Sequence, residues 1–106
     1  MLKIDFDLRQ LEIFCRVVEL KSFSRAADAV FLAQASVSER IANLEKSVGT
    51  TLLDRMGRQI VPTKVGELLY RHALRILDMK KTARQEIEKF LGLKQGEILL
   101  GGSTIP

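Results

Sequence analysis

Residues 22–49 read SFSRAADAVFLAQASVSERIANLEKSVG, and this stretch decides the fold. It contains two sets of apolar residues at helical spacing, separated only by residues 32–33. We expect a short helix over residues 25–31 with Ser24 as its N-cap, because a serine oxygen there accepts a backbone N–H. A second helix should end at Gly49, the residue type favoured just after a helix. Two helices joined by so short a connection predict a helix-turn-helix.

The start of the second helix has two possible positions. Ser36 and Glu39 match a capping box, which would begin the helix late. A start at Gln34 would instead leave Ala33 as a poor N-cap. In both cases an apolar stripe forms the core face, made of Val37, Ile41, Leu44 and Val48. At 100° per residue the opposite face then holds a polar set with its flanks: Gln34, Ala35, Ser38, Glu39, Arg40, Ala42, Asn43 and Lys46.

The segments on either side complete a small domain. Upstream, Asp7 and Gln10 form a capping box for a helix that should run to about Leu20. Downstream, residues 52–55 and 59–62 are strand-like pieces around a glycine turn, which predicts a hairpin. The fold class is therefore mainly α: a winged helix-turn-helix of three helices and a two-stranded wing, followed by a long helix.

The long helix should begin after Thr63 and cover residues 64–91. Its apolar positions continue well beyond the reach of so small a domain, so its far half needs a partner helix. We expect a two-fold homodimer through antiparallel packing of this helix, with Ile76 and Ala83 at the contact. The complete predicted interface is Val65, Leu69, Ala73, Ile76, Ala83, Ile87 and Phe90. After it, residues 96–102 resemble one buried strand bounded by glycines, the start of a further domain.

Composition narrows the function. A chain of 106 residues supports one small domain, and it has no apolar run of membrane-spanning length. The single cysteine, Cys15, agrees with a reducing compartment, so we expect a cytoplasmic protein. The chain has 17 Lys and Arg against 13 Asp and Glu, but this excess is uneven. Residues 1–62 contain nine basic and eight acidic residues, whereas residues 63–95 contain eight basic and four acidic residues. DNA binding by the N-terminal part must therefore depend on individually placed residues. No metal-ligand cluster, phosphate loop or carboxylate pair indicates an enzyme or a cofactor.

Several motifs in register carry a family resemblance. Residues 8–11 (LRQL) with Phe14, and residues 22–27 (SFSRAA), resemble the start of LysR-type transcriptional regulators. Residues 33–38 (AQASVS), and residues 52–55 (LLDR), are similar to that family's recognition helix and wing. The resemblance extends from Phe6 to Gly66 and implies three segments. These are a DNA-binding domain over residues 1–63, a linker and dimerisation helix over 64–91, and a hinge with the first strand of a missing effector-binding domain over 92–106.

The resemblance also implies which residues contact DNA. A recognition helix presents its core-opposed face to base edges in the major groove, so base readout falls to Gln34, Ala35, Ser38 and Glu39. The amide of Gln34 matches adenine, and Glu39 can accept from cytosine while repelling phosphate. Five further residues should meet phosphate or the minor groove. They lie at the start of the short helix over residues 25–31, on the flank of the recognition helix, at the wing tip and at the start of the long helix: Ser24, Arg25, Arg40, Arg58 and Thr63.

The partners implied are double-stranded DNA, bound at an interrupted inverted repeat, and a second copy of the chain. A tetramer is the alternative for a full-length protein, and a small-molecule effector would bind only through the missing C-terminal domain. Two other interpretations remain at this stage. One is a winged-helix DNA-binding protein of another family, and the other is a helical interaction module that binds no DNA.

Overall fold

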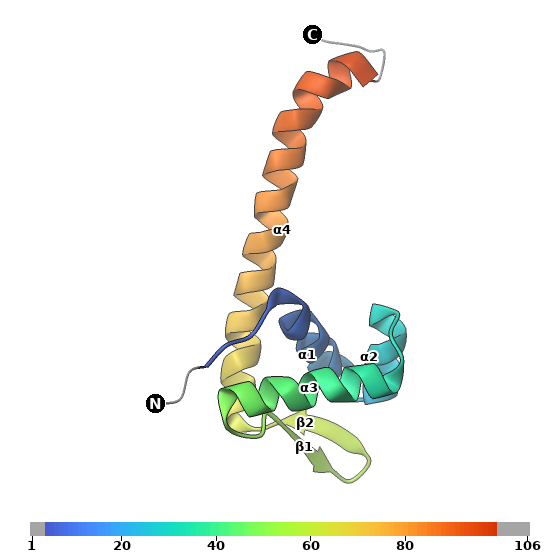
Figure 1. Cartoon of the computed structure of the whole chain (residues 1–106), viewed down its shortest axis with the longest axis vertical. Helices are drawn as coiled ribbons and strands as arrows, with labels where there is room; N and C mark the ends of the chain where they lie inside the picture. Colours follow the sequence, from blue (N-terminus) through green and yellow to red (C-terminus); the bar gives the residue numbers. More distant parts are fainter. Residues whose placement is uncertain (1–3, 100–106) are drawn as a thin grey trace.

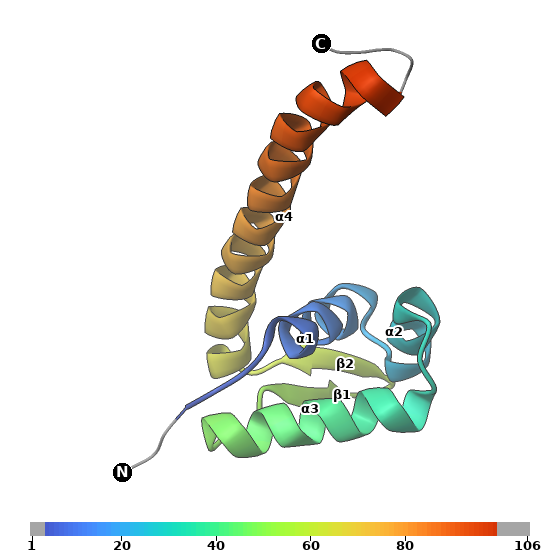
Figure 2. The same ribbon diagram turned by 45° about the horizontal axis from the view of Figure 1, so that its top comes forward.

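A computed structural model describes residues 4–99 and shows a small head with one long arm (Figure 1). The head comprises α1 (Leu8–Leu20), α2 (Phe23–Val30), α3 (Gln34–Val48) and a hairpin of β1 (Leu53–Met56) and β2 (Gln59–Pro62). The arm is α4 (Lys64–Leu99), whose first half packs on α1 and whose second half rises away from α3 and the hairpin (Figure 2). The winged helix-turn-helix with a long helix is thus confirmed. In the described part of the chain, no helix combines the length and apolar character needed to cross a membrane.

The core lies where α1 meets the helix pair. Phe14 of α1 is completely buried among apolar residues of α2, α3 and the wing. Ala26 and Ala27 of α2 are small enough to let α1 and α3 approach closely, and both are buried. The remaining buried members of this cluster are Ile13, Val17, Val30, Val37, Ile41, Leu44, Leu52 and Ile60.

The helix caps agree with the sequence in α1 and differ in α2. The predicted capping box is present, since the Asp7 carboxylate accepts from Gln10 N–H and the Gln10 side chain accepts from Asp7 N–H. The prediction of Ser24 as the α2 N-cap is wrong. Ser22 has the extended backbone of an N-cap, and its Oγ accepts from Arg25 N–H at 3.1 Å. The helix therefore starts two residues earlier, at Phe23, and the Ser24 side chain lies in its first turn.

The turn and the start of α3 are both distinctive. α2 ends one residue before the predicted end, with Phe31 in the left-handed region (φ 60°) and 92% exposed. α3 begins at Gln34, the earlier of the two possible starts, and Ala33 supplies no side-chain cap. The Ala33 carbonyl accepts from the N–H groups of both Ser36 and Val37. Only the first two N–H groups of α3 therefore lack an acceptor within the helix.

The wing is held by the pairing of its two strands and by hydrogen bonds to a side chain of α3. β1 and β2 are antiparallel, with Met56 opposite Gln59 across the turn at Gly57 (φ 62°). The Glu45 carboxylate of α3 accepts from the N–H groups of Leu52 and Leu53, at 2.8 and 3.1 Å. These two bonds fix the root of the wing to the end of α3.

The start of α4 is packed tightly on the wing. Thr63 is the predicted N-cap, and its Oγ1 accepts from Gly66 N–H at 3.1 Å. Gly66 lies directly on the Leu52 carbonyl, where an added Cβ would be 2.0 Å from the oxygen. Further along, Ala73 is fully buried against Leu11 and Cys15 of α1.

Two predictions about the arm are wrong in part. Ala73 cannot belong to a dimer interface because it is fully buried within its own chain, and Leu69 and Ile76 are half-buried against the same cluster. A hinge and a strand were expected over residues 92–106, but α4 continues through 92–99. Isolated glycines cost a helix only about 1 kcal/mol each, and the residues between them are good helix formers. The rest of the predicted strand, residues 100–102, lies outside the described part.

Candidate nucleic-acid interface

The outer face of α3 is exposed, and its polar side chains make no hydrogen bonds or ion pairs with the described part of the chain. Gln34, Ala35, Ser38 and Glu39 are all exposed, whereas the opposite stripe of α3 is buried in the core. Within residues 4–99, no hydrogen bond or ion pair occupies the side chains of Gln34, Ser38 or Glu39. This face therefore presents an amide, a hydroxyl and a carboxylate to whatever binds it, with one methyl group among them.

The N-terminus of α3 adds backbone donors to this face. Because Ala33 offers no side-chain acceptor, the N–H groups of Gln34 and Ala35 remain without a capping partner. Free N–H groups and the helix dipole give a helix N-terminus partial positive charge. An acceptor atom on a bound molecule would be favoured there.

The N-terminus of α2 carries a cation whose charge is not paired. Arg25 is exposed, and within the described residues its guanidinium has no carboxylate partner. Its backbone N–H is already bonded to Ser22, and Ser22 Oγ also lies 3.1 Å from Ser24 Oγ. The backbone donors left at this end belong to Phe23 and Ser24 instead of Arg25. An anion here would meet those two N–H groups together with the arginine side chain.

The wing carries two exposed arginines, of which the sequence predicted only Arg58 to contact DNA. Arg58 is exposed next to the Gly57 turn, as expected of a wing-tip residue. Arg55 of β1 is also exposed, and within the described part its side chain forms no ion pair. Successive residues of β1 point to opposite faces of the hairpin, so the exposure of Arg55 could be inferred only once the register of the strands was known.

Of the residues predicted to meet phosphate, one is engaged within the fold and another is partly covered by it. Thr63 Oγ1 accepts from Gly66 N–H and donates to the Thr51 carbonyl at 2.9 Å, so its hydroxyl is already occupied on both sides. Arg40 is half-buried and lines a shallow hollow shared with Asp7 and Gln10 of α1. Glu39 lines the same hollow, so Arg40 lies on the flank of α3 beside α1 and next to the Gln34 face.

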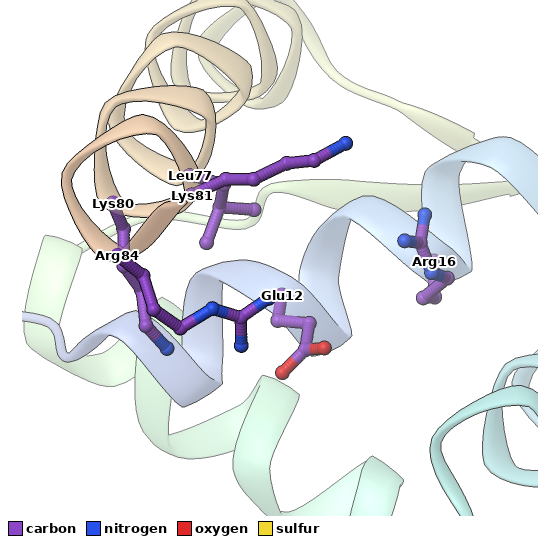
Figure 3. A pocket seen from close by; sticks show the side chains of 6 residues that line it. All are labelled: Glu12, Arg16, Leu77, Lys80, Lys81 and Arg84. Atoms are coloured by element: carbon purple, nitrogen blue, oxygen red, sulfur yellow. The ribbon is translucent and has the colours of Figure 1, made fainter. Parts of the chain in front are cut away.

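Another group of cations lies elsewhere: Arg84 is paired with Glu88 at 3.9 Å, and Lys80 and Lys81 have no ion-pair partner among the described residues. A hollow of about 360 Å³ opens at the elbow where the free part of α4 leaves α1, lined by Glu12, Arg16, Leu77, Lys80, Lys81 and Arg84 (Figure 3). Glu12 and Arg16 are each paired along α1, with Arg9 and Glu19. The charge surplus found in residues 63–95 is thus carried by the arm, and the free arm points away from α3 and the wing (Figure 1).

The groups with perturbed pKa values lie away from this face. Burial raises the pKa of the Cys15 thiol to about 11, and Glu19 adds to the effect. Partial burial and a hydrogen bond from its hydroxyl to Glu19 (2.9 Å) raise the pKa of Tyr70 to about 12. Both groups stay neutral at physiological pH and brace α1 against α4. Among residues 4–99, no three His, Cys, Asp or Glu side chains gather as a metal site requires.

Comparisons with known proteins agree on one family. Residues 8–67 match the model of the bacterial regulatory helix-turn-helix protein, lysR family. The chain is 41% identical over 100 residues to the SDS degradation transcriptional activation protein of Pseudomonas sp., covering 94% of this chain and 33% of that protein. It is 39% identical over 94 residues to the HTH-type transcriptional regulator CfxR of Cupriavidus necator, covering 89% and 30%.

A solved structure places the same fold on DNA. The crystal structure of the BenM DNA-binding domain in complex with catB site 1 DNA is 34% identical, with a TM-score of 0.78. The match covers 81% of this chain and 96% of that one. Against the curated relatives, however, the chain spans about a third of their length.

Proposed function

Because this chain belongs to the LysR family of bacterial regulatory helix-turn-helix proteins, we propose that it is the DNA-binding part of a transcriptional regulator, and not an enzyme. It would bind double-stranded DNA in a sequence-specific way. The observation that carries the proposal is the outer face of α3, where Gln34, Ser38 and Glu39 are exposed and without partners in the described part. Such polar groups on a helix beside a wing are suited to reading base edges in a major groove.

Each residue of this face has a role that follows from its chemistry. The Gln34 amide can donate to and accept from one adenine, and the Ala35 methyl can contact a thymine methyl. Ser38 can donate or accept. Glu39 can accept from cytosine N4, and its charge keeps that part of α3 from approaching phosphates closely.

Phosphate contacts would fix the position of the head on the duplex. Arg25 with the N–H groups of Phe23 and Ser24 forms one such contact at the start of α2. Arg58, together with Arg55, would follow the backbone or enter the minor groove beside the wing, where the potential attracts arginine. We assign Arg40 and Thr63 supporting roles only, since the fold already uses or partly covers their side chains.

Two copies would act together. The exposed apolar residues of α4 favour a homodimer through the arm, with one head at each end. Two heads related by a two-fold axis read an interrupted inverted repeat, with half-sites separated by whole helical turns. The remaining two thirds of a full-length regulator would carry effector binding, as the resemblance implies.

Selection of bound sites from random duplex DNA tests this function and supplies the site. Enrichment of an interrupted inverted repeat is the expected result. If no sequence is enriched and anisotropy shows no salt-dependent binding, the chain is an interaction module and the proposal is wrong.

Two variants then test the assignment of residues. Gln34→Ala should cost ~1–3 kcal/mol on the selected site and little on a scrambled duplex, because it removes a hydrogen-bonding group that faces a base. Arg25→Ala should weaken binding to both duplexes alike. It should also lower the slope of log K against log salt by about one for each phosphate that is no longer neutralised, hence by about two per dimer. Identical behaviour of the two variants would contradict the placement of α3 in the groove.

A further inference from the structure

The hollow at the elbow of α1 and α4 brings together cations from two helices. Its volume is about 360 Å³, and most of the side chains that line it are Lys or Arg. Figure 3 shows Lys81 and Arg84 extending from α4 toward the side of α1 that carries Arg16. The arm rises from this elbow away from α3 and the wing (Figure 1), so the proposed DNA-binding face does not use these cations.

The negative charge available inside the hollow does not balance its cations. Glu12 is the one carboxylate in the lining, and it is already paired along α1. Lys80 and Lys81 have no ion-pair partner within residues 4–99. Arg84 lies 3.9 Å from Glu88, but both side chains are 67% exposed, and exposed pairs of this kind are weak. Like charges one turn apart on a helix repel each other, so a bound anion would stabilise this part of α4.

The lining of the hollow defines the class of ligand. Leu77 is its only apolar side chain, whereas sites for apolar ligands are lined mainly by hydrophobic residues. A volume of about 360 Å³ is near the lower limit of small-molecule sites, so the ligand must be small. Lys and Arg donate charge-assisted hydrogen bonds to the oxygens of phosphate and carboxylate groups. Cations on two sides of the hollow suit an ion that carries at least two such groups.

We propose that the elbow binds a small polyanion, an ion with two or more phosphate or carboxylate groups, between Arg16 of α1 and the cations of α4. These cations are Lys80, Lys81 and Arg84. The bound ion joins α1 to the free part of α4 and thereby fixes the direction in which the arm leaves the head. This site is separate from the face of α3, so it does not depend on the function proposed above.

Arg16 also connects the hollow to a spectroscopic reporter. It forms an ion pair with Glu19, and Glu19 accepts a hydrogen bond from the Tyr70 hydroxyl at 2.9 Å. Tyr70 is the single tyrosine of a chain that has no tryptophan, so tyrosine fluorescence reports on this network alone. An anion held by Arg16 competes with Glu19 for the guanidinium. The Glu19 carboxylate is then left to the Tyr70 hydroxyl and accepts its hydrogen bond more strongly.

Titration with inorganic pyrophosphate tests the site. Tyr70 emission should fall in a saturable way, because a hydroxyl bonded more strongly to a carboxylate is quenched. The melting temperature should rise over the same concentrations, since the ion binds the folded chain. A parallel titration with citrate shows whether the site prefers phosphate or carboxylate groups, and sodium chloride at equal ionic strength controls for screening. The proposal is wrong if neither pyrophosphate nor citrate gives a saturable change beyond that of sodium chloride.

A pair of matched variants tests the location of the site. Lys80→Gln/Lys81→Gln removes two cations of the hollow and should weaken pyrophosphate binding about tenfold or more. Arg71→Gln/Lys89→Gln removes the same charge from exposed positions of α4 outside the hollow and should bind pyrophosphate as the natural chain does. Equal weakening in the two variants would show a general attraction of anions to the basic arm and would overturn the site.

Duplex DNA is the polyanion that competes with this assignment. Because the arm leads away from α3, Lys80→Gln/Lys81→Gln should leave the affinity for the selected DNA site unchanged. The slope of log K against log salt should also stay the same, since no phosphate contact is lost. A smaller slope in this variant would assign the elbow to the phosphates of a duplex and overturn the assignment to a small ion.

Discussion

At the scale of single residues, the Cys15 thiol links the pH to the stability of the head. Its pKa is raised to about 11 by burial, above the roughly 8.5 of an unfolded thiol. Folding therefore favours the neutral thiol, and this contribution is complete below the unfolded pKa and is lost as the pH rises through the folded one. We expect the free energy of unfolding to fall by about 1–2 kcal/mol between about pH 8.5 and 10.

Urea unfolding under reducing conditions at several pH values measures this loss. Cys15→Ala should be less stable at pH 7 because it leaves a small cavity, but its stability should change much less over the same range. Tyr70, whose pKa is raised to about 12, begins to contribute only near pH 10, where an unfolded tyrosine ionises, and it does so equally in both proteins. An equally steep fall in the variant would show that another group is responsible.

The missing cap of α3 is a second property of a single residue. Ala33 occupies the N-cap position without a side-chain acceptor, whereas Ser22 caps α2 through its hydroxyl. Ala33→Ser should therefore raise the free energy of unfolding by about 0.5–1 kcal/mol, and Ser22→Ala should lower it by about 1 kcal/mol. Thermal melts of the two variants give the comparison, and Ser36→Ala should be nearly neutral because α3 starts before it. A clear loss in Ser36→Ala with no gain in Ala33→Ser would contradict this start.

At the scale of elements, the junction of the wing with α4 depends on one glycine. A Cβ on Gly66 would lie 2.0 Å from the Leu52 oxygen and 3.2 Å from Pro62 Cβ. Since backbone cannot yield as a side chain does, Gly66→Ala should lower the free energy of unfolding by at least about 2 kcal/mol. Gly92→Ala is the matched control, because nothing lies within 4 Å of its added methyl group. It should raise the helical circular dichroism signal slightly and leave the melting temperature of the head unchanged or higher.

The elements themselves were largely predictable, for reasons that the individual cases make clear. Helices with a strong 3.6-residue period and a capping box, such as α1, are specified locally, and so is the hairpin turn at Gly57. The start of α2 was not, because Ser22 and Ser24 are both good caps and only their backbone conformations separate them. The end of α4 failed because a short apolar run between glycines fits a strand or a helix equally well.

The candidate site was predictable in part for the same physical reason. Which residues of α3 share a face follows from helical periodicity, so exposure of the Gln34 face agrees with expectation. Whether a given side chain is occupied depends on segments distant in sequence. The engagement of Thr63 by Thr51, and the burial of Ala73 by α1, could not be inferred from local spacing.

At the scale of the whole molecule, charge and apolar surface are separated between head and arm. The head is nearly neutral, with an excess of one positive charge over residues 1–62, whereas residues 63–95 have an excess of four. The free arm extends away from α3, and the molecule measures 57 Å along its longest axis. Specific placement on DNA would thus come from the head, and the spacing between two heads from the arm.

This separation predicts that dimerisation and half-site recognition can be uncoupled. Met79 is 70% exposed on the free part of α4, so Met79→Asp should leave the fold of the head intact and produce a monomer. A monomer still has the complete face of α3 and should bind a single half-site with unchanged affinity. It loses the second, effectively intramolecular binding event, so its affinity for the full inverted repeat should fall by about 100-fold or more.

Sedimentation of Met79→Asp, with anisotropy on half-site and full-site duplexes, measures both effects. Leu74→Asp is the control, because Leu74 is also exposed (41%) but lies on the other side of Ala73 from Met79. It should remain dimeric and keep its preference for the full site, since a charge there meets solvent in the paired arms as well as in the free chain. If Met79→Asp reduced half-site binding to the same extent as full-site binding, the arm would be part of the DNA-binding surface. The assignment of DNA binding to the head alone and of dimerisation to the arm would then be wrong.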